Sequence, residues 1–144
     1  MDYICVKKTE IQGIDGLFKL KKGAHVEKIG DYLIKNGKRI CVWRSQTAKE
    51  NFFLNDDGEG LAKSAKLIEI RERIGELLEA SRILHEELNT EGMGEEEIIK
   101  AHEELVDPNR DKLDELSKLP CFATSDAPYQ ATLEELEEAY DLLA

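Results

Sequence analysis

The sequence predicts an α+β protein, with a small β module in residues 1–60 and an acidic helical region in residues 61–144. Short alternating apolar segments separated by glycine turns indicate the β module. A long stretch, residues 61–90, has apolar positions three and four residues apart, which is the spacing of one helix face. Charge divides the chain at the same place. Residues 1–60 carry 11 Lys and Arg against 9 Asp and Glu, whereas residues 61–144 carry 9 against 22.

The first 60 residues are expected to hold six short strands, with one helical turn over residues 46–51 before the last. Asn36-Gly37 is a strong hairpin signal, because both residue types tolerate a positive φ. Short strands this close together predict a small SH3-like barrel, whose closure removes exposed edges. An open meander resting on the long helix is the alternative. The expected strands are Tyr3–Lys7, Leu17–Lys21, His25–Ile29, Tyr32–Lys35, Lys38–Arg44 and Phe52–Leu54.

Residues 61–90 are predicted to form one amphipathic helix that joins the two parts. Its apolar stripe has two possible covers: shorter helices of the same chain, or a second copy paired as in a coiled coil. We expect the chain's own helices to cover part of the stripe and a homo-oligomer, a dimer or larger, to bury the remainder. The candidate seam residues are Leu67, Ile70, Ile74, Leu77, Leu84 and Leu88.

Three shorter acidic helices are expected to follow the long one. Residues 95–106 form the first of them. Asp107-Pro108 begins the second, with Asp as the N-cap and Pro at the first helical position. Thr132 and Glu135 have the spacing of a capping box and begin the third. The segment 121–131 between the last two is expected to be a packed loop.

No catalytic or metal-binding motif has the spacing that its chemistry requires. The histidines form neither HExxH nor the Glu-x-x-His pattern of di-iron bundles. The acidic run 55–59 is similar to a calcium loop, but Phe53 and Ser64 stand where an EF-hand needs carboxylates. We therefore expect no enzymatic activity, no cofactor and no bound metal. The histidines are His25, His85 and His102.

The cysteines Cys5, Cys41 and Cys121 are odd in number and form no CxxC pair, which favours reduced thiols in a cytosol. Cys121 with His102 is the one nucleophile and base that could be paired, and a buried structural cysteine is the simpler interpretation. The first residues lack a signal-peptide pattern, and no apolar run approaches the ~18 residues of a membrane span. The sequence predicts a cytoplasmic protein without membrane contact.

The charge distribution indicates the kind of partner to expect. The net charge is −11, and the helical region should repel nucleic acid and attract basic protein surfaces. The β module is only weakly basic, so direct nucleic-acid binding is not expected. Carboxylates on rigid helices can imitate DNA phosphates, and a merely solvated face is the alternative. The candidate partner-binding residues are Glu95, Glu96, Glu97, Glu103, Glu104, Glu134, Glu135, Glu137, Glu138 and Asp141.

One motif leads into the charged helix. It consists of Ser45-Gln46-Thr47-Ala48, Phe52 and Asn55-Asp56-Asp57-Gly58-Glu59-Gly60-Leu61. In this motif the chain resembles the N-terminal part of small accessory proteins from phages and prophages of Gram-positive bacteria. The resemblance covers residues 1–70 and implies a phage setting, in the cytoplasm of a host cell.

Together these observations predict a non-enzymatic phage accessory protein that binds a host protein as inhibitor or adaptor. A host defence nuclease or another nucleic-acid-binding enzyme would fit the acidic helices as a target. Two alternatives remain open. One is an oligomeric structural or assembly component of the phage, joined through the long helix. The other is a small-ligand or nucleotide binder that uses the basic residues of the β module.

Overall fold

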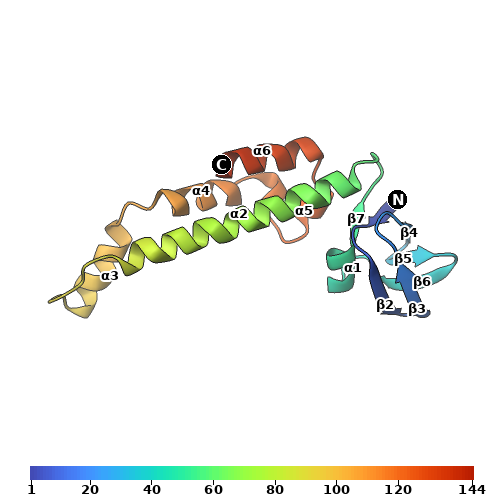
Figure 1. The fold of residues 1–144 in the computed structure, drawn as a ribbon, viewed down its shortest axis with the longest axis horizontal. Coiled ribbons are helices and arrows are strands. Elements are labelled where there is room, and N and C mark those ends of the chain that lie inside the picture. The colour runs from blue at the N-terminus through green and yellow to red at the C-terminus, as the bar shows by residue number, and fades with distance from the viewer.

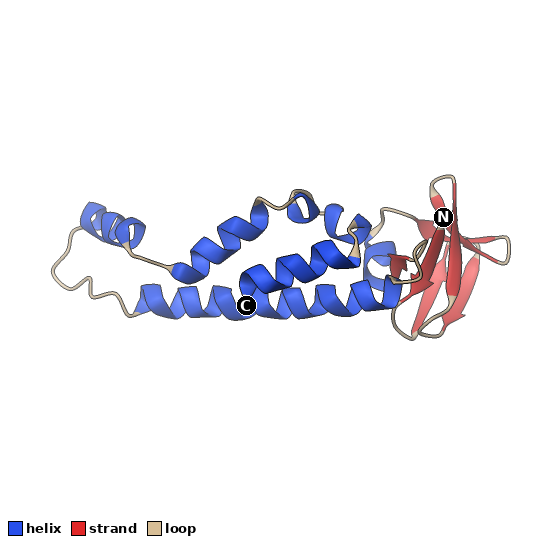
Figure 2. Cartoon of the chain, turned by 90° about the horizontal axis from the view of Figure 1, so that it is seen from above, coloured by secondary structure: helices blue, strands red, loops and turns tan.

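The computed structural model describes residues 1–144 and confirms the α+β class. The strands gather at one end of an elongated molecule, and the long helix α2 (Gly60–Glu86) extends away from them (Figure 1). Seen from above, the helices that follow α2 in the chain lie beside it or beyond its far end (Figure 2). With a rise of 1.5 Å per residue, α2 spans about 40 Å. None of the helices combines the length and apolar composition that a membrane span requires.

The N-terminal strands are β1 (Asp2–Cys5), β2 (Thr9–Gly13), β3 (Gly16–Leu20), β4 (His25–Ile29), β5 (Tyr32–Lys35), β6 (Lys38–Val42) and β7 (Phe52–Leu54), and α1 (Gln46–Asn51) precedes β7. Five of them form an antiparallel sheet in the order β6-β5-β4-β1-β7, and β2 and β3 form a separate hairpin. The tip of this hairpin lies against β6, where the Ile14 N–H donates to the Ile40 carbonyl at 3.0 Å. The strands are not hydrogen-bonded into one closed barrel, so the predicted SH3-like barrel is not confirmed.

The sequence pattern located six of the seven strands and missed β2. Within β2 only Ile11 is apolar and buried, so the segment has too little alternation to be recognised as a strand. The predicted Asn36-Gly37 turn is confirmed, with φ angles of 52° and 76°. Asn36 is the one residue other than glycine with a positive φ.

Strands β1 and β7 lie between two hydrophobic cores. On one side Tyr3, Cys5 and Phe52 belong to the core inside the β module. On the other side Ile4 and Phe53 belong to the core of the helical region. Because successive side chains of a strand point to opposite faces, two adjacent strands can contribute to both cores at once. The β module and the helices therefore share packed side chains.

The remaining helices are α3 (Glu95–Glu104), α4 (Pro108–Ser117), the 3₁₀ turn η1 (Pro120–Phe122), α5 (Ala127–Gln130) and α6 (Leu133–Leu143). Helices α4 and α6 pack on α2 and on each other. Leu116 from α4, and Leu136, Ala139 and Leu143 from α6, are buried there. The segment 121–131, predicted as a packed loop, contains most of η1 and the single turn α5.

The ends of the helices follow the predicted caps with one exception. Asp107 accepts from the backbone N–H of Arg110 at the start of α4, and Thr132 caps α6 in a complete capping box. Helix α2, however, ends at Glu86 and not at residue 90. The Asn89 side chain accepts from the Glu91 N–H and forms a local turn, and such bonds compete with helical ones.

Candidate partner-binding surfaces

All ten predicted partner-binding carboxylates are exposed. They lie on two helices, five on α3 and five on α6. Figure 1 places α3 at the end of the molecule away from the sheet, whereas α6 lies along the half of α2 nearest the sheet. The structure therefore presents two separate acidic surfaces and does not bring the ten residues into one site.

The acidic surface on α3 follows from the position of this helix at the end of the molecule. Helix α3 begins after Gly94 and contains no buried residue. Its first turn holds Glu95, Glu96 and Glu97, and carboxylates at this position are stabilised by the helix dipole. Glu103 and Glu104 add two more carboxylates in its last turn. Five acidic residues thus surround a short helix that little else covers.

The acidic surface on α6 lies opposite its buried face. Leu136, Ala139 and Leu143 face the core, and the carboxylates occupy the other sides of the helix. The Glu135 carboxylate belongs to the capping box, where it accepts from the Thr132 hydroxyl at 3.1 Å. It is therefore already engaged within the chain.

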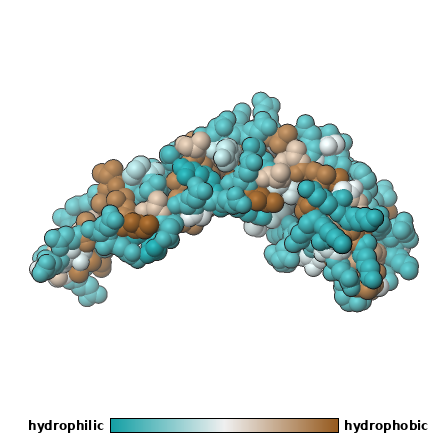
Figure 3. Space-filling model, viewed as in Figure 1, coloured by the Kyte–Doolittle hydropathy of each residue, from teal (hydrophilic) through white to brown (hydrophobic).

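Most of these carboxylates have no positive partner within the chain. On α3 a single ion pair joins Lys100 and Glu104, at a distance of 3.9 Å. No ion pair involves the five acidic residues of α6. Exposed carboxylates without an internal partner keep their field directed to solvent, where a basic surface can meet it. Figure 3 shows hydrophilic residues over most of the visible face, with small separate apolar patches among them.

The six predicted seam residues lie in different surroundings. Leu67, Ile70 and Leu77 are buried in the core that α4 and α6 form with α2. Ile74 and Leu84 are half-buried. Leu88 lies beyond the end of α2, so its assignment to the long helix was wrong. Pairing of the stripe with a second copy stays a prediction, and its first half is covered by helices of the same chain.

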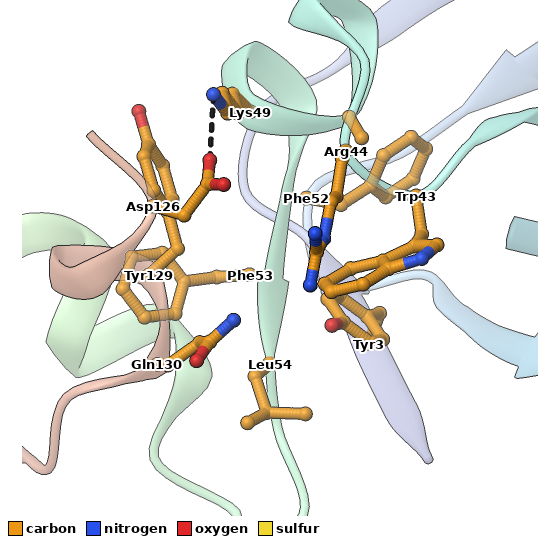
Figure 4. A pocket seen from close by; sticks show the side chains of 11 residues that line it. Tyr3, Trp43, Arg44, Lys49, Phe52, Phe53, Leu54, Asp126, Tyr129 and Gln130 are labelled. Atoms are coloured by element: carbon orange, nitrogen blue, oxygen red, sulfur yellow. Dashed lines mark ion pairs between the residues drawn. The ribbon is translucent and has the colours of Figure 1, made fainter. Parts of the chain in front are cut away.

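A small pocket lies where the β module meets α5. Figure 4 shows Trp43, Arg44 and Lys49 on the side of the β module, facing Asp126 and Tyr129 from the helical region. The Lys49 ammonium and the Asp126 carboxylate are 2.7 Å apart, and this ion pair lowers the pKa of Asp126.

The size and walls of this pocket limit what it can hold. The Arg44 guanidinium lies over the Trp43 ring, 4.3 Å from its centre. The cavity has a volume of only about 30 Å³, which is the volume that one water molecule occupies in the liquid. A nucleotide needs a pocket of several hundred Å³, so it does not fit into this cavity. No pattern in the sequence indicated this pocket, because its walls come from segments about 80 residues apart.

The residues considered for catalysis are not brought together. Cys121 is buried in the helical core, and its thiol points toward the Glu135 carbonyl at 4.0 Å. Burial raises the pKa of this thiol, so its nucleophilic thiolate form is disfavoured. His102 lies on α3 and contacts His85 of α2 instead. No cluster of three or more His, Cys, Asp or Glu side chains has the spacing of a metal site.

The acidic run 55–59 has a structural role at the start of α2. The Asn55 side chain accepts from the Gly60 N–H at 2.7 Å and so caps the helix. Asp57 pairs with the buried Lys63 at 2.6 Å.

Comparison with protein-family models, with curated proteins and with solved structures gave no match to this chain.

Proposed function

We propose that this chain is a non-enzymatic phage accessory protein that binds a basic surface of a host protein, as inhibitor or adaptor. The observation that carries the proposal is the set of exposed carboxylates on α3, four of which have no ion pair. Helix α3 stands at the end of a helix about 40 Å long, away from the weakly basic β module. A partner can therefore approach α3 without meeting the rest of the chain.

The physical basis of the proposal is electrostatic. A cluster of carboxylates accelerates association with a positively charged surface and opposes binding to other acidic proteins. The basic groove of a nucleic-acid-binding enzyme, such as a host defence nuclease, has this charge because it must bind phosphates. An acidic helix in that groove would exclude the nucleic acid.

Two charge variants test the proposal. In the first, Glu96, Glu97, Glu103 and Glu104 on α3 are changed to Gln. In the second, the same number of charges is removed from α6 by Glu134→Gln, Glu137→Gln, Glu138→Gln and Asp141→Asn. Both variants have the same net charge, so they differ only in where the charge was lost.

The assay is capture of proteins from a Gram-positive host lysate, quantified by mass spectrometry at low and at high salt. The wild-type chain should retain a basic protein at low salt and lose it at high salt. The α3 variant should retain at least about tenfold less, whereas the α6 variant should behave like wild type. Equal loss in both variants would mean that net charge alone attracts the captured protein, and the proposal would fail.

A second candidate function is an oligomeric structural or assembly component. Its support is the exposure of large apolar side chains on the outer faces of α2, namely Ile68, Leu78 and Ile83. Light scattering separates the two candidates. The binding proposal allows a particle near the chain mass of 16.4 kDa, whereas an assembly component forms a particle many times heavier.

We also infer that the β module is SH3-like. The strand order β6-β5-β4-β1-β7, the short helix before the last strand and the hairpin lying on β6 all support this inference. In the proposed function the β module serves as a scaffold, because its strands β1 and β7 also pack into the core around α2.

A further inference from the structure

Two histidines from different helices share a close contact at the far end of α2. The Nδ1 atom of His85 on α2 lies 2.9 Å from the Nδ1 atom of His102 on α3. The ring centres are 5.1 Å apart, and the ring planes differ by 21°. Two imidazole rings whose nitrogens are this close can hardly have their centres farther apart, so the rings do not lie face to face. The rings therefore meet edge to edge, with the two nitrogens facing each other.

This geometry requires one hydrogen between the two nitrogens. An imidazole nitrogen either donates or accepts, so two bare nitrogens or two N–H groups at this distance would repel. The other nitrogen of His85, Nε2, lies 3.3 Å from Oδ2 of Asp107. A buried carboxylate at this position holds a hydrogen on Nε2 and leaves Nδ1 to face His102.

Asp107 is itself firmly held. Its Oδ2 atom accepts from the Ser81 hydroxyl at 2.5 Å, and its Oδ1 atom accepts from the backbone N–H of Arg110. These hydrogen bonds lower the pKa of Asp107, and the bond from Ser81 has the largest effect. Asp107 therefore stays a carboxylate. The carboxylate of Asp107, which caps α4, thus fixes the orientation of the His85 ring. The Nδ1 atom of His85 then points at His102 on α3.

The histidine contact is the sole hydrogen bond between a side chain of α3 and another element. No residue of α3 is buried, and no ion pair joins α3 to the rest of the chain. Ile98, Ala101 and Leu105 are half-buried. The position of α3 on the molecule therefore depends strongly on this contact.

We propose that the contact between His85 and His102 is a one-proton latch, which holds α3 against α2 and opens when both imidazoles become protonated. Histidine is the side chain that changes charge between about pH 5 and 8. When only one proton is added, the latch stays closed. A positively charged His85 carries a hydrogen on each nitrogen, so it can donate to Asp107 through Nε2 and to a neutral His102 through Nδ1. A second proton places two positive N–H groups face to face, and the contact is lost.

The charged groups around the latch do not remove this conflict. The cleft of about 500 Å³ beside the histidines is lined by Arg82 from α2, Glu103 from α3 and by Arg110 and Asp111 from α4, in addition to Asp107. Two of these side chains are positive and three are negative. None of these charged side chains lies between the two facing nitrogens, which are 2.9 Å apart.

The test measures the distance between α2 and α3 as pH falls. Spin labels are attached at Ala80→Cys and Lys100→Cys, both exposed positions, and distances are recorded by pulsed electron resonance from pH 8 to pH 5. With wild-type histidines we expect one short distance at pH 8, and at least a threefold loss of that population at pH 5. In His102→Gln the glutamine cannot gain a proton, so the distances should not change with pH.

His25→Gln serves as the matched control, because His25 lies in the β module and should leave the pH response intact. Hydrogen exchange by mass spectrometry, over the same pH range, should show α3 losing protection while α6 keeps it. An unchanged distance in the wild type, an equal response in His102→Gln, or simultaneous loss of protection in α3 and α6 would each overturn the latch. The test uses no partner, so its outcome is independent of the proposed function.

Discussion

Gly60 shows how a single residue connects the sheet to the long helix. A Cβ atom at this position would lie 2.6 Å from Cγ2 of Ile4 and 2.8 Å from Oδ1 of Asn55. Asn55 cannot move away, because its side chain caps α2 and also donates to Asp2. Only glycine therefore lets β1 and the first turn of α2 approach this closely.

Gly60→Ala should lower the free energy of unfolding by about 1–3 kcal/mol, because overpacking forces the helix away from the sheet. The matched control is Gly75→Ala. Gly75 lies within α2 with open space around it, and alanine there should stabilise the chain by up to about 1 kcal/mol. Urea unfolding of the two variants measures both effects, and an equal change in the two would contradict this account.

Asp57 and Lys63 give a prediction about pH. The Lys63 side chain is 4% exposed and pairs with Asp57. This contact lowers the pKa of Asp57 below its ordinary value of 3.8. The stability from the pair is therefore complete above that value and is lost as the pH falls through the lower pKa of the folded chain.

The Asp57→Asn variant should be less stable than wild type at pH 7, and the difference should shrink between about pH 4 and pH 2. Thermal unfolding followed over this range checks the prediction. Asp31→Asn removes an exposed carboxylate without an ion pair and should produce no such convergence. A difference for Asp57→Asn that stays constant down to pH 2 would exclude a role for the pair.

At the scale of single residues, the sequence predicted less about sites than about turns. The run 55–60 was recognisable as a turn, because it is rich in Asn, Asp and Gly. The contact between Gly60 and Ile4 was not predictable, since it depends on which strand is folded next to the helix. The contact between His85 and His102 was missed for the same reason, because α3 turns back at a loop whose geometry the spacing does not define.

At the scale of elements, the packing of α6 on α2 decides how much of the apolar stripe is free. Leu136 is 0% exposed within this packing, whereas Ile99 on α3 is 53% exposed. Leu136→Ala should lower the free energy of unfolding by about 2–5 kcal/mol. Ile99→Ala should change it by less than about 0.5 kcal/mol.

Chemical unfolding at several protein concentrations measures both variants. If α6 covers α2 within one chain, the unfolding midpoint of Leu136→Ala will not depend on concentration. A midpoint that rises with concentration would mean that a second copy supplies part of the cover. A small effect of Leu136→Ala would mean that α6 does not pack as described.

The elements themselves were largely predictable. Apolar residues three and four apart identified the buried positions Leu67, Ile70 and Leu77, and caps at Asp107 and Thr132 located two helix starts. The pattern could not say which element covers the stripe, because α4 and α6 have equally suitable apolar faces. It also missed β2, whose single buried side chain gives no periodicity.

At the scale of the whole molecule, the shared strands β1 and β7 should make unfolding cooperative. Ile4 and Phe53 belong to the helical core while their neighbours belong to the core of the β module. Trp43 reports on the β module by fluorescence, and circular dichroism at the helical band reports on the helices. The two unfolding curves should coincide, and separate midpoints would show that the two parts fold independently.

Helix α2 is one continuous helix that holds the β module and the acidic helix α3 at opposite ends. Spin labels at Ala65→Cys and Ile83→Cys, both exposed while the native cysteines are buried, measure this directly. The two positions are five helical turns apart on the same side, so their separation should be about 27 Å. We predict a single narrow distance near that value, and a shorter distance or a broad distribution would contradict a continuous α2.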